Sequence, residues 1–367
     1  MDITIDARAA LWYKGTGMGT YARDLLGGLQ ELNRHTYNIV LPQGVLPLAE
    51  AIPVLKENSQ ENIGFWELVH RNPAKPVEGS QILHNLHNGF GLPPDPDCAT
   101  VVTIHDLIPL IMPEYCGSPY KEIFNAEIGQ IAAQADKIIA ASHCTKKDII
   151  QHLKIKPQKI TVIYQGADRI FRPLNKGLVQ RELRKHYGLE GNYILYVGGF
   201  NPRKNLSTLV AAFSLIQHEI DWNLVIVGKE GKQAAEIKAL AAESIQPGRV
   251  IFTGYIPTAA LPLFYNGAKV FVYPSLYEGF GLPPLEAASC GAAVILANSA
   301  SLPEVMANKA LYVNARDEKE LARSILHLYR HENERITMAR DCFAHSRQFS
   351  RQNAAKQTLA VYENLCR

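Results

Sequence analysis

The sequence predicts an α/β fold with two domains. Short apolar strands and amphipathic helices alternate along nearly the whole chain, which is the order of parallel sheets covered by helices. The 367 residues exceed what one ordinary hydrophobic core accommodates. After Tyr164, a stretch with Gly and Pro but no helix signal interrupts the alternation. We therefore expect an N-terminal domain over residues 1–170 and a C-terminal domain over residues 171–349.

Short apolar runs bounded by turn residues predict the strands, and apolar positions three and four apart predict the helices. In the first half the predicted strands are 3–5, 37–41, 82–85, 101–104, 137–141 and 160–163. The predicted helices there are 20–32, 120–135 and 144–153. In the second half the predicted strands are 193–197, 224–227, 250–252, 270–273, 293–296 and 311–313. The predicted helices there are 205–216, 232–242, 285–290, 318–330 and a long helical tail that ends at residue 366.

Composition indicates a soluble globular protein. Hydrophobic residues make up 47% of the chain, charged residues 20%, and the formal net charge is +3. This mild basicity is compatible with a small anion or a membrane surface and gives no case for nucleic acid. The first residues lack signal-peptide features and no apolar run has membrane-spanning length, so we expect a cytoplasmic protein. The six cysteines show no C-x-x-C spacing and are expected to be free thiols.

The segment EGFGLPPLEAASCGAAVI, residues 278–295, is the most informative stretch of the chain. It joins a predicted buried strand to a predicted helix, and Gly279 and Gly281 allow backbone amides to approach a ligand closely. Free amides at a helix start bind anions. Because Glu278 and Glu286 flank this anion site, we expect a ligand that carries hydroxyl groups as well as phosphate.

A second candidate site follows the first predicted strand of the second half, in VGGFNPRKNL. Gly199, Arg203 and Lys204 come after the strand end, where α/β sheets usually bind ligands. A solvated Arg-Lys pair at a helix start is the plain structural alternative. Because a helix start disfavours cations, we interpret the pair as a diphosphate site.

Three glycines near the N-terminus, Gly15, Gly17 and Gly19, precede a predicted helix that Thr20 could cap. The spacing approaches G-x-G-x-x-G, but Thr20 takes the place of the third glycine and the loop does not follow the first strand tightly. We interpret the segment as a flexible glycine loop that reaches over a ligand. A simple hinge is an equally open interpretation.

Polar residues also follow strands of the first half. His105 and Asp106 come directly after an apolar strand, which favours a functional role over a core histidine paired with its neighbour. For His84 and His87 the structural interpretation is favoured. The acidic pair in DPD, residues 95–97, lies in a proline-rich loop and is interpreted as a turn, so no metal site is expected.

An ordered set of motifs spans nearly the whole chain: GTGMGTY, HDL, IYQGAD, VGGFNPRKN, GYI, EGFGLPPLEA and SLPEV. With this set the chain resembles the retaining glycosyltransferases of family 4, among the group 1 glycosyl transferases. The resemblance implies the GT-B fold, in which two Rossmann-like, doubly wound domains face each other across a cleft. The N-terminal domain would bind the acceptor and the C-terminal domain the nucleotide sugar. A C-terminal helix, about residues 350–367, would pack back on the N-terminal domain.

The resemblance also implies roles for the candidate residues. Glu278 would lie beside the donor sugar, Glu286 would hold the ribose hydroxyls, and Arg203 and Lys204 would hold the diphosphate. His105 would line the donor sugar, and with Glu278, Arg203 and Lys204 it completes the expected catalytic set. The further donor-binding positions are Gly17, Gly19, Gly199, Tyr255, Ile256, Gly279, Phe280, Gly281 and Leu282.

Two of these positions carry more specific expectations. Tyr255 or Ile256 resembles the segment whose backbone reads the base. Many relatives have an arginine directly after the strand glycine, where this chain has Gly199, so Arg203 would be the sole arginine on the diphosphate. The helix start at 282–286 would stabilise the leaving group together with Arg203 and Lys204.

The implied activity is transfer of a hexose with retention, by front-face attack, from a nucleotide-diphosphate sugar to a glycan or lipid-linked acceptor in polysaccharide or glycoconjugate synthesis. The motifs look closest to bacterial mannosyl- and rhamnosyl-type transferases, so GDP-mannose is the first donor and UDP-sugars follow. The resemblance implies no metal and no cofactor besides this donor, and it allows peripheral contact with the inner membrane face. A nicotinamide-dependent Rossmann oxidoreductase and a catalytically silent sugar-nucleotide binder are the alternatives.

Overall fold

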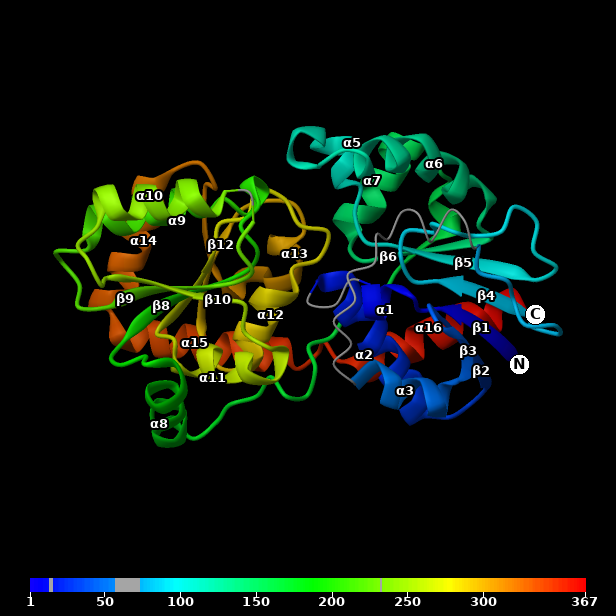
Figure 1. The fold of residues 1–367 in the computed structure, drawn as a ribbon, viewed down its shortest axis with the longest axis horizontal. Coiled ribbons are helices and arrows are strands. Elements are labelled where there is room, and N and C mark those ends of the chain that lie inside the picture. The colour runs from blue at the N-terminus through cyan, green and yellow to red at the C-terminus, as the bar shows by residue number, and fades with distance from the viewer. Residues whose placement is uncertain (13–15, 57–72, 232) are drawn as a thin grey trace. The chain divides into compact units, whose positions relative to one another are not determined.

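The computed structural model describes residues 1–12, 16–56, 73–231 and 233–367. The chain divides into two compact units (Figure 1), one made of Met1–Gly166 with Phe349–Arg367 and the other of Ala167–Gln348. The division after Gly166 falls four residues before the boundary expected from the sequence. In the described residues, no helix has the length and apolar character needed to cross a membrane. All six cysteines are free thiols.

The first unit is built on a sheet of seven strands, within the described residues, in the order β3-β2-β1-β4-β5-β6-β7. Neighbouring strands are parallel except β2 and β3. The strands are β1 (Asp2–Asp6), β2 (Thr36–Leu41), β3 (Gly44–Pro47), β4 (Ile82–Asn85), β5 (Ala99–Ile104), β6 (Lys137–Ala140) and β7 (Ile160–Val162). The helices are α1 (Ala9–Trp12), α2 (Gly17–Leu32), α3 (Leu48–Lys56), α5 (Ile108–Ile111), α6 (Tyr120–Gln134), α7 (His143–Leu153) and α16 (Arg351–Leu365).

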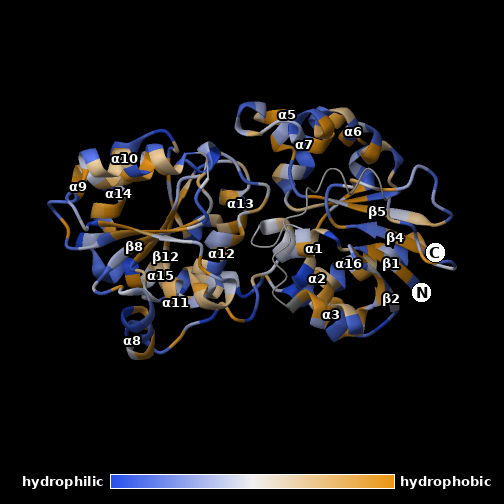
Figure 2. Cartoon of the chain, in the orientation of Figure 1, coloured by the Kyte–Doolittle hydropathy of each residue, from blue (hydrophilic) through white to orange (hydrophobic). Residues whose placement is uncertain are grey.

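Helices cover both faces of this sheet. In Figure 1, α2, α3 and α16 lie over one face and α5, α6 and α7 over the other. The first layer packs through Leu25, Leu48 and Tyr362, which are buried against the strands. The second layer packs through Phe124 and Ile149. Figure 2 shows that these helices carry both polar and apolar residues, as expected for helices with one side against a sheet.

The second unit has a sheet of six parallel strands, among the residues described, in the order β10-β9-β8-β11-β12-β13. The strands are β8 (Tyr193–Val197), β9 (Asn223–Val227), β10 (Val250–Gly254), β11 (Val270–Tyr273), β12 (Ala293–Ala297) and β13 (Leu311–Val313). The helices are α8 (Lys176–Tyr187), α9 (Leu206–Ile216), α10 (Ala234–Ser244), α11 (Leu261–Gly267), α12 (Leu282–Ser289), α13 (Leu302–Met306), α14 (Glu318–Arg330) and α15 (Glu332–Ser346). In Figure 1, α9, α10 and α14 lie on one face of this sheet and α11, α12 and α15 on the other.

These two sheets confirm the predicted α/β class, and every predicted strand is present with ends within two residues of the prediction. The prediction missed β3, which is short and largely exposed, and α3, which contains Pro53. It also missed α8, although Asn175 caps its start by accepting from the Leu178 amide at 3.1 Å.

The single helical tail predicted to end at residue 366 is wrong. Two helices occupy it, α15 in the second unit and α16 in the first. Ser350 separates them because its hydroxyl accepts from the Asn353 amide at 3.2 Å and starts a new helix. Within the first unit, α16 packs beside α2, so the chain end belongs to the core of that unit.

Candidate functional site

The loop between β11 and α12 carries Glu278. It ends at Gly281, which has φ 105° and precedes the first residue of α12. A Cβ atom there would lie 2.8 Å from a Leu302 methyl group, so both the backbone conformation and the close neighbour require glycine. The helix begins three residues earlier than predicted, at Leu282, with the two prolines in its first turn.

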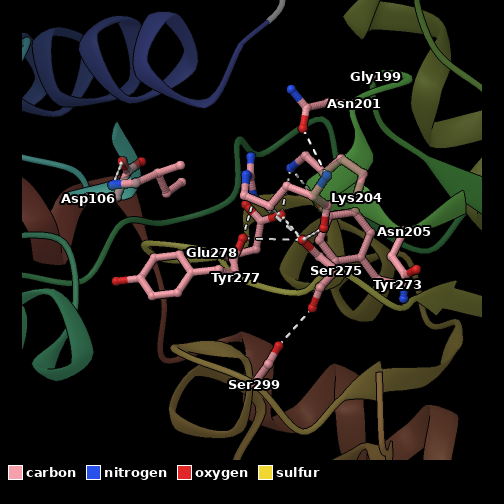
Figure 3. Close-up of polar contacts among 12 residues, drawn as sticks. Asp106, Gly199, Asn201, Lys204, Asn205, Tyr273, Ser275, Tyr277, Glu278 and Ser299 are labelled. Atoms are coloured by element: carbon pink, nitrogen blue, oxygen red, sulfur yellow. Dashed lines mark hydrogen bonds and ion pairs between the residues drawn. The ribbon is translucent and has the colours of Figure 1, made fainter. Parts of the chain in front are cut away.

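Three donors converge on one oxygen of Glu278 (Figure 3). Its Oε1 lies 2.8 Å from an Arg203 guanidinium nitrogen and 2.7 Å from Lys204 Nζ. Ser275 donates its hydroxyl to the same oxygen at 2.6 Å. Lys204 also donates to the Tyr273 hydroxyl at 2.6 Å. The sequence therefore brings its two candidate sites together, since the cations after β8 pair with the glutamate after β11.

The backbone fixes this arrangement as well. The Leu276 amide donates to the Arg203 carbonyl at 2.8 Å, and the Asn205 side chain donates to the Pro274 carbonyl at 3.1 Å. Arg203 donates in addition to the Tyr277 carbonyl. The two strand-end loops thus behave as one hydrogen-bonded unit at the carboxyl edge of the sheet, the usual ligand edge of α/β folds.

Electrostatics keep Glu278 ionised. Burial opposes ionisation of this carboxyl, but the charges of Arg203 and Lys204 outweigh it and hold its pKa at about 2. Two cations against one carboxylate leave the cluster with a surplus positive charge. An anionic ligand would therefore find this positive charge already in place.

Glu286, one helical turn into α12, has the opposite electrostatic environment. It is buried, and its Oε2 accepts the Tyr265 hydroxyl at 2.7 Å. Burial raises the pKa of this carboxyl to about 7, and the hydrogen bond from Tyr265 lowers it only in part. Glu278 and Glu286, eight positions apart, thus have pKa values shifted in opposite directions.

The start of α12 is a poorer amide donor than the sequence suggested. Pro283 and Pro284 have no N–H, so the amides available at the cap are those around Gly281 and Leu282. The loop before it is held by Ser301, whose hydroxyl lies 2.8 Å from the carbonyl oxygens of Glu278 and Phe280. Sequence reasoning assigned no role to this serine, although SLPEV was among the motifs.

The glycines in the neighbouring loops differ in how much space a side chain would have. A Cβ atom at Gly228 would lie 1.9 Å from the Gly198 carbonyl oxygen, so β8 and β9 approach each other too closely for any other residue. A Cβ atom at Gly199 would meet nothing within 4 Å. Tyr255, after β10, is 53% exposed, whereas its neighbour Ile256 is buried. An exposed aromatic ring at this edge could stack on a flat ligand.

In the first unit, His105 lies in a buried network. Its Nε2 donates to the Leu86 carbonyl at 2.9 Å, and its Nδ1 lies 3.4 Å from the Gln165 amide nitrogen. Burial lowers its pKa to about 4, so the ring is neutral at neutral pH. Asp106 accepts from the Ile108 amide at 3.0 Å. The position after β5 is as predicted, but the geometry is that of a well-partnered core histidine.

His84 and His87 also belong to buried networks, as predicted. The two ring nitrogens of His84 lie 2.5 Å from the Tyr362 hydroxyl and 2.9 Å from the Thr103 hydroxyl. Burial lowers the pKa of His84 to about 3. His87 Nε2 lies 3.7 Å from Asp6 Oδ2. These contacts tie strand ends and α16 together within the first unit.

The interpretation of the glycine segment as a flexible loop is wrong for the glycines that the structure describes, because they are helical. Gly17 and Gly19 lie in the first turn of α2, and Thr16, not Thr20, is the cap, with its hydroxyl 3.4 Å from the Gly19 amide. The hydroxyl of Thr16 satisfies a free amide and so starts the helix earlier than expected. Gly15 lies outside the described residues.

Acidic residues 95–97 lie in the irregular segment before β5, as the turn interpretation expected. In the part of the chain that the structure describes, one group of three possible metal ligands occurs, formed by His327, His331 and Glu334 at the junction of α14 and α15. None of these belongs to the candidate site.

Two family models match the chain. "Glycosyl transferases group 1" matches residues 179–342, and "Glycosyltransferase Family 4" matches residues 15–169. The O-antigen chain mannosyltransferase B of Escherichia coli is 27% identical over 98% of this chain and 99% of that protein. The serotype-specific mannosyltransferase WbdA of Escherichia coli is 34% identical over 61% of this chain, a match that spans 28% of WbdA.

Two solved structures share the fold. Sucrose-phosphate synthase from Thermosynechococcus elongatus superposes with a TM-score of 0.76 at 21% identity, over 100% of this chain and 99% of that one. HepE from Anabaena, in complex with UDP-glucose, superposes with a TM-score of 0.75 at 17% identity, over 99% of this chain and 100% of that one. The two family models favour a sugar transferase over a nicotinamide-dependent oxidoreductase.

Proposed function

Because this chain belongs to the group 1 glycosyltransferases and has their GT-B fold, we propose that it transfers a hexose from a nucleotide-diphosphate sugar to a glycan or lipid-linked acceptor. Mannose is the first sugar and GDP-mannose the first donor, a choice supported by similarity to two mannosyltransferases of Escherichia coli. UDP-sugars are the next donors, since HepE was solved with UDP-glucose. The product would be a polysaccharide or another glycoconjugate, as the O-antigen relatives suggest.

One observation carries the proposal: the cluster in which Arg203 and Lys204 share Glu278 at the carboxyl edge of a parallel sheet. Partly buried cations fixed by a carboxylate are already oriented, so they can meet a diphosphate with little reorganisation. In this proposal the diphosphate binds beside the cations and takes part of their hydrogen bonding from Glu278. The amides around Gly281 and Leu282 add backbone donors on the helix side.

Glu278 and Glu286 then have different tasks. Glu278, held ionised at a pKa of about 2, accepts hydroxyl hydrogen bonds from the donor sugar. Glu286 accepts from the ribose hydroxyls, and its ionised form is the better acceptor. Gly279 and Phe280 bring the loop backbone near the sugar and phosphates.

The chemistry is a substitution at the anomeric carbon. The bond from that carbon to the diphosphate oxygen breaks, and charge grows on the departing diphosphate through an oxocarbenium-like transition state. The acceptor oxygen bonds to the same face of the carbon, and the acceptor proton passes to the departing oxygen. Arg203, Lys204 and the start of α12 stabilise the departing charge, so the transfer is proposed to be retaining and independent of metal.

The remaining candidates complete the donor and acceptor contacts. Tyr255 and Ile256 would receive the base, with the exposed Tyr255 ring as stacking surface. Gly199 leaves open space beside the diphosphate. From the first unit, His105 would contact the donor sugar as a neutral hydrogen-bonding group, and the start of α2 with Gly17 and Gly19 would approach the phosphates or acceptor. We place the reaction in the cytoplasm, with peripheral contact to the membrane when the acceptor is lipid-linked.

The test combines binding and turnover. Thermal shifts are measured with GDP-mannose, UDP-glucose, ADP-glucose and dTDP-rhamnose, because a donor at 100 times its Kd adds about 2.7 kcal/mol of stability. The preferred donor is then incubated with mannose oligosaccharides, and nucleoside diphosphate release and the anomeric configuration of the product are measured. A shift by GDP-mannose with a retained α-configuration supports the proposal. Binding without any transfer would instead favour the silent binder, and inversion would overturn the mechanism.

A further inference from the structure

A cavity opens at the amino edge of the second unit's sheet, the edge opposite the Glu278 cluster. It has a volume of about 390 Å³ and is lined by Lys176, Asn266, Lys269, Arg335, Arg340 and Phe343, among others. We call it the basal cavity. A second hollow of about 350 Å³ shares Lys176, Asn266 and Lys269 with it. Lys269 immediately precedes β11 whereas Glu278 follows it, so a strand's length separates the two regions.

Four cations from three separate segments face this cavity. Lys176 comes from α8, Lys269 from the turn before β11, and Arg335 and Arg340 from α15, while Glu332 is the acid among the lining residues. Arg335 is the fixed member, since its side chain is 8% exposed. Its guanidinium lies 5.0 Å from the Trp222 ring centroid and 3.1 Å from the Leu328 carbonyl oxygen.

The other cations make no direct ion pair in the part of the chain that the structure describes. Within the described residues, Glu332 pairs with Arg335 at 2.7 Å, and no ion pair involves Lys176, Lys269 or Arg340. Burial lowers the pKa of Lys269, and the charges of Arg335 and Lys176 lower it further, against a partial compensation from Glu332 and Asp221. The cluster therefore repels itself, and an anion bound among these groups would remove that repulsion.

We propose that the basal cavity binds a phosphate group, carried either by a soluble metabolite or by a lipid headgroup, through Lys176, Lys269 and Arg340, with Arg335 as a fixed positive wall. Its volume lies in the range of small-molecule sites. Ile336 and Phe343 line one side and give the site an apolar wall for the body of the ligand. The donor is not its occupant, because ligands of parallel sheets bind at the carboxyl edge.

Titration calorimetry with inorganic pyrophosphate tests the site. In the Lys269→Ala/Arg340→Ala protein, we expect pyrophosphate to bind at least about tenfold more weakly at one site, since each lost charged hydrogen bond removes more than a factor of ten. The same protein should keep its affinity for the nucleoside diphosphate of the donor. Lys204→Ala should instead weaken binding of the nucleoside diphosphate and leave pyrophosphate binding at the basal cavity unchanged. Failure of the proposed function and failure of this site are therefore distinguishable.

The matched control is Lys185→Ala/Arg316→Ala, which removes two exposed cations outside the cavity. Circular dichroism verifies the fold, and the single Arg340→Ala variant repeats the test if the double variant is unfolded. Pyrophosphate binding that is unchanged in Lys269→Ala/Arg340→Ala, or reduced equally in the control, overturns the proposal.

Vesicle sedimentation then separates the two sources of phosphate. Phosphatidylcholine vesicles with and without phosphatidylglycerol are compared for the wild-type chain and the double variant. Sedimentation with the anionic vesicles that the double substitution abolishes assigns the site to a lipid headgroup. If the double variant loses pyrophosphate binding but the wild type does not bind vesicles, the site is assigned to a soluble phosphate.

Discussion

The carboxyl edges of the two sheets have opposite electrostatic character. In the second unit, Arg203 and Lys204 hold Glu278 ionised, with its pKa at about 2. In the first unit, burial lowers the pKa of His84 to about 3 and of His105 to about 4, so both imidazoles are neutral at neutral pH. The same type of fold therefore presents fixed charge at one edge and neutral hydrogen-bonding groups at the other.

The proposed function offers a reason for this difference. A diphosphate needs positive charge that is already in place, whereas a neutral sugar needs donors and acceptors. The ion pair near the first edge, between Asp6 and Arg8, is buried and bidentate, with guanidinium to carboxylate distances of 2.8 and 2.6 Å. The edge of the first unit therefore offers mainly neutral hydrogen-bonding groups, and the edge of the second unit offers charge.

The largest expected effect tests the charged edge. Lys204→Ala removes one of two preorganised cations, so kcat/KM should fall by about 10²- to 10³-fold, or roughly 3 to 4 kcal/mol of barrier. The melting temperature should change far less than the activity. Lys238→Ala, at an exposed ion pair with Glu230, is the matched control and should leave turnover unchanged. Near-normal activity in a folded Lys204→Ala protein would remove the lysine from the mechanism.

Glu278→Gln tests the other half of the cluster. It preserves shape but leaves Arg203 and Lys204 without their counter-charge, and breaking a buried pair costs about 3 kcal/mol or more of unfolding free energy. Since the diphosphate no longer competes with a carboxylate, nucleoside diphosphate should bind more tightly while turnover falls. Denaturant unfolding and calorimetry measure the two effects. Weaker nucleoside diphosphate binding would contradict the competition between Glu278 and the ligand.

The contribution of Glu286 to the free energy of unfolding should depend on pH with the opposite sign to that of Glu278. Its folded pKa of about 7 lies above its usual value of 4.5, so the folded state binds more protons than the unfolded state between these pH values. Its contribution to stability is therefore complete below pH 4.5 and falls by roughly 3 kcal/mol as the pH rises to 7. Glu278 contributes above pH 4.5 and loses that contribution as the pH falls toward 2.

Unfolding by urea at a series of pH values measures this. Glu286→Gln should flatten the decline in unfolding free energy between pH 4.5 and 7. The pH dependence of stability below pH 4.5 should not change. Nucleotide binding at pH 6 should release a proton in the wild type, because ribose hydroxyls favour the ionised carboxylate. An unchanged decline in Glu286→Gln would show that another group produces it.

The sequence predicted the strands of both sheets because fully buried parallel strands are continuous apolar runs, as in Tyr193–Val197 and Val270–Tyr273. It could not predict which side chains pair. Lys204 and Glu278 are 74 residues apart, and His84 and Tyr362 are 278 apart. Such contacts depend on how strands are ordered in the sheet and on where the chain end returns.

Local signals were missed for local reasons. The start of α2 was placed at Thr20 because three glycines look like a loop, yet Thr16 had the better capping position. The protonation of Glu286 also could not be inferred, since it depends on burial against Tyr265 from a different helix. Residue types thus indicated a candidate site, and tertiary contacts decide the charge of its side chains.

Tyr362→Phe tests the neutral edge in the first unit. It removes the hydroxyl 2.5 Å from His84 Nδ1 and leaves a buried ring nitrogen without that partner, which should cost about 1 to 3 kcal/mol of unfolding free energy. Turnover should be unchanged at temperatures where the protein is folded, because this network is structural. A large loss of kcat with normal stability would show that the first unit's histidine network reaches the reaction.

The smallest expected effect concerns Gly199 at the charged edge. Gly199→Ala adds a Cβ atom that meets nothing within 4 Å, and so should change stability by less than about 1 kcal/mol. Gly228→Ala is the matched contrast, because its Cβ atom would lie 1.9 Å from the Gly198 carbonyl oxygen and would force β8 and β9 apart. Thermal unfolding of both variants measures the difference. If Gly199→Ala keeps full stability but weakens nucleoside diphosphate binding, the open space at Gly199 belongs to the ligand, and the charged edge extends from Glu278 to the end of β8.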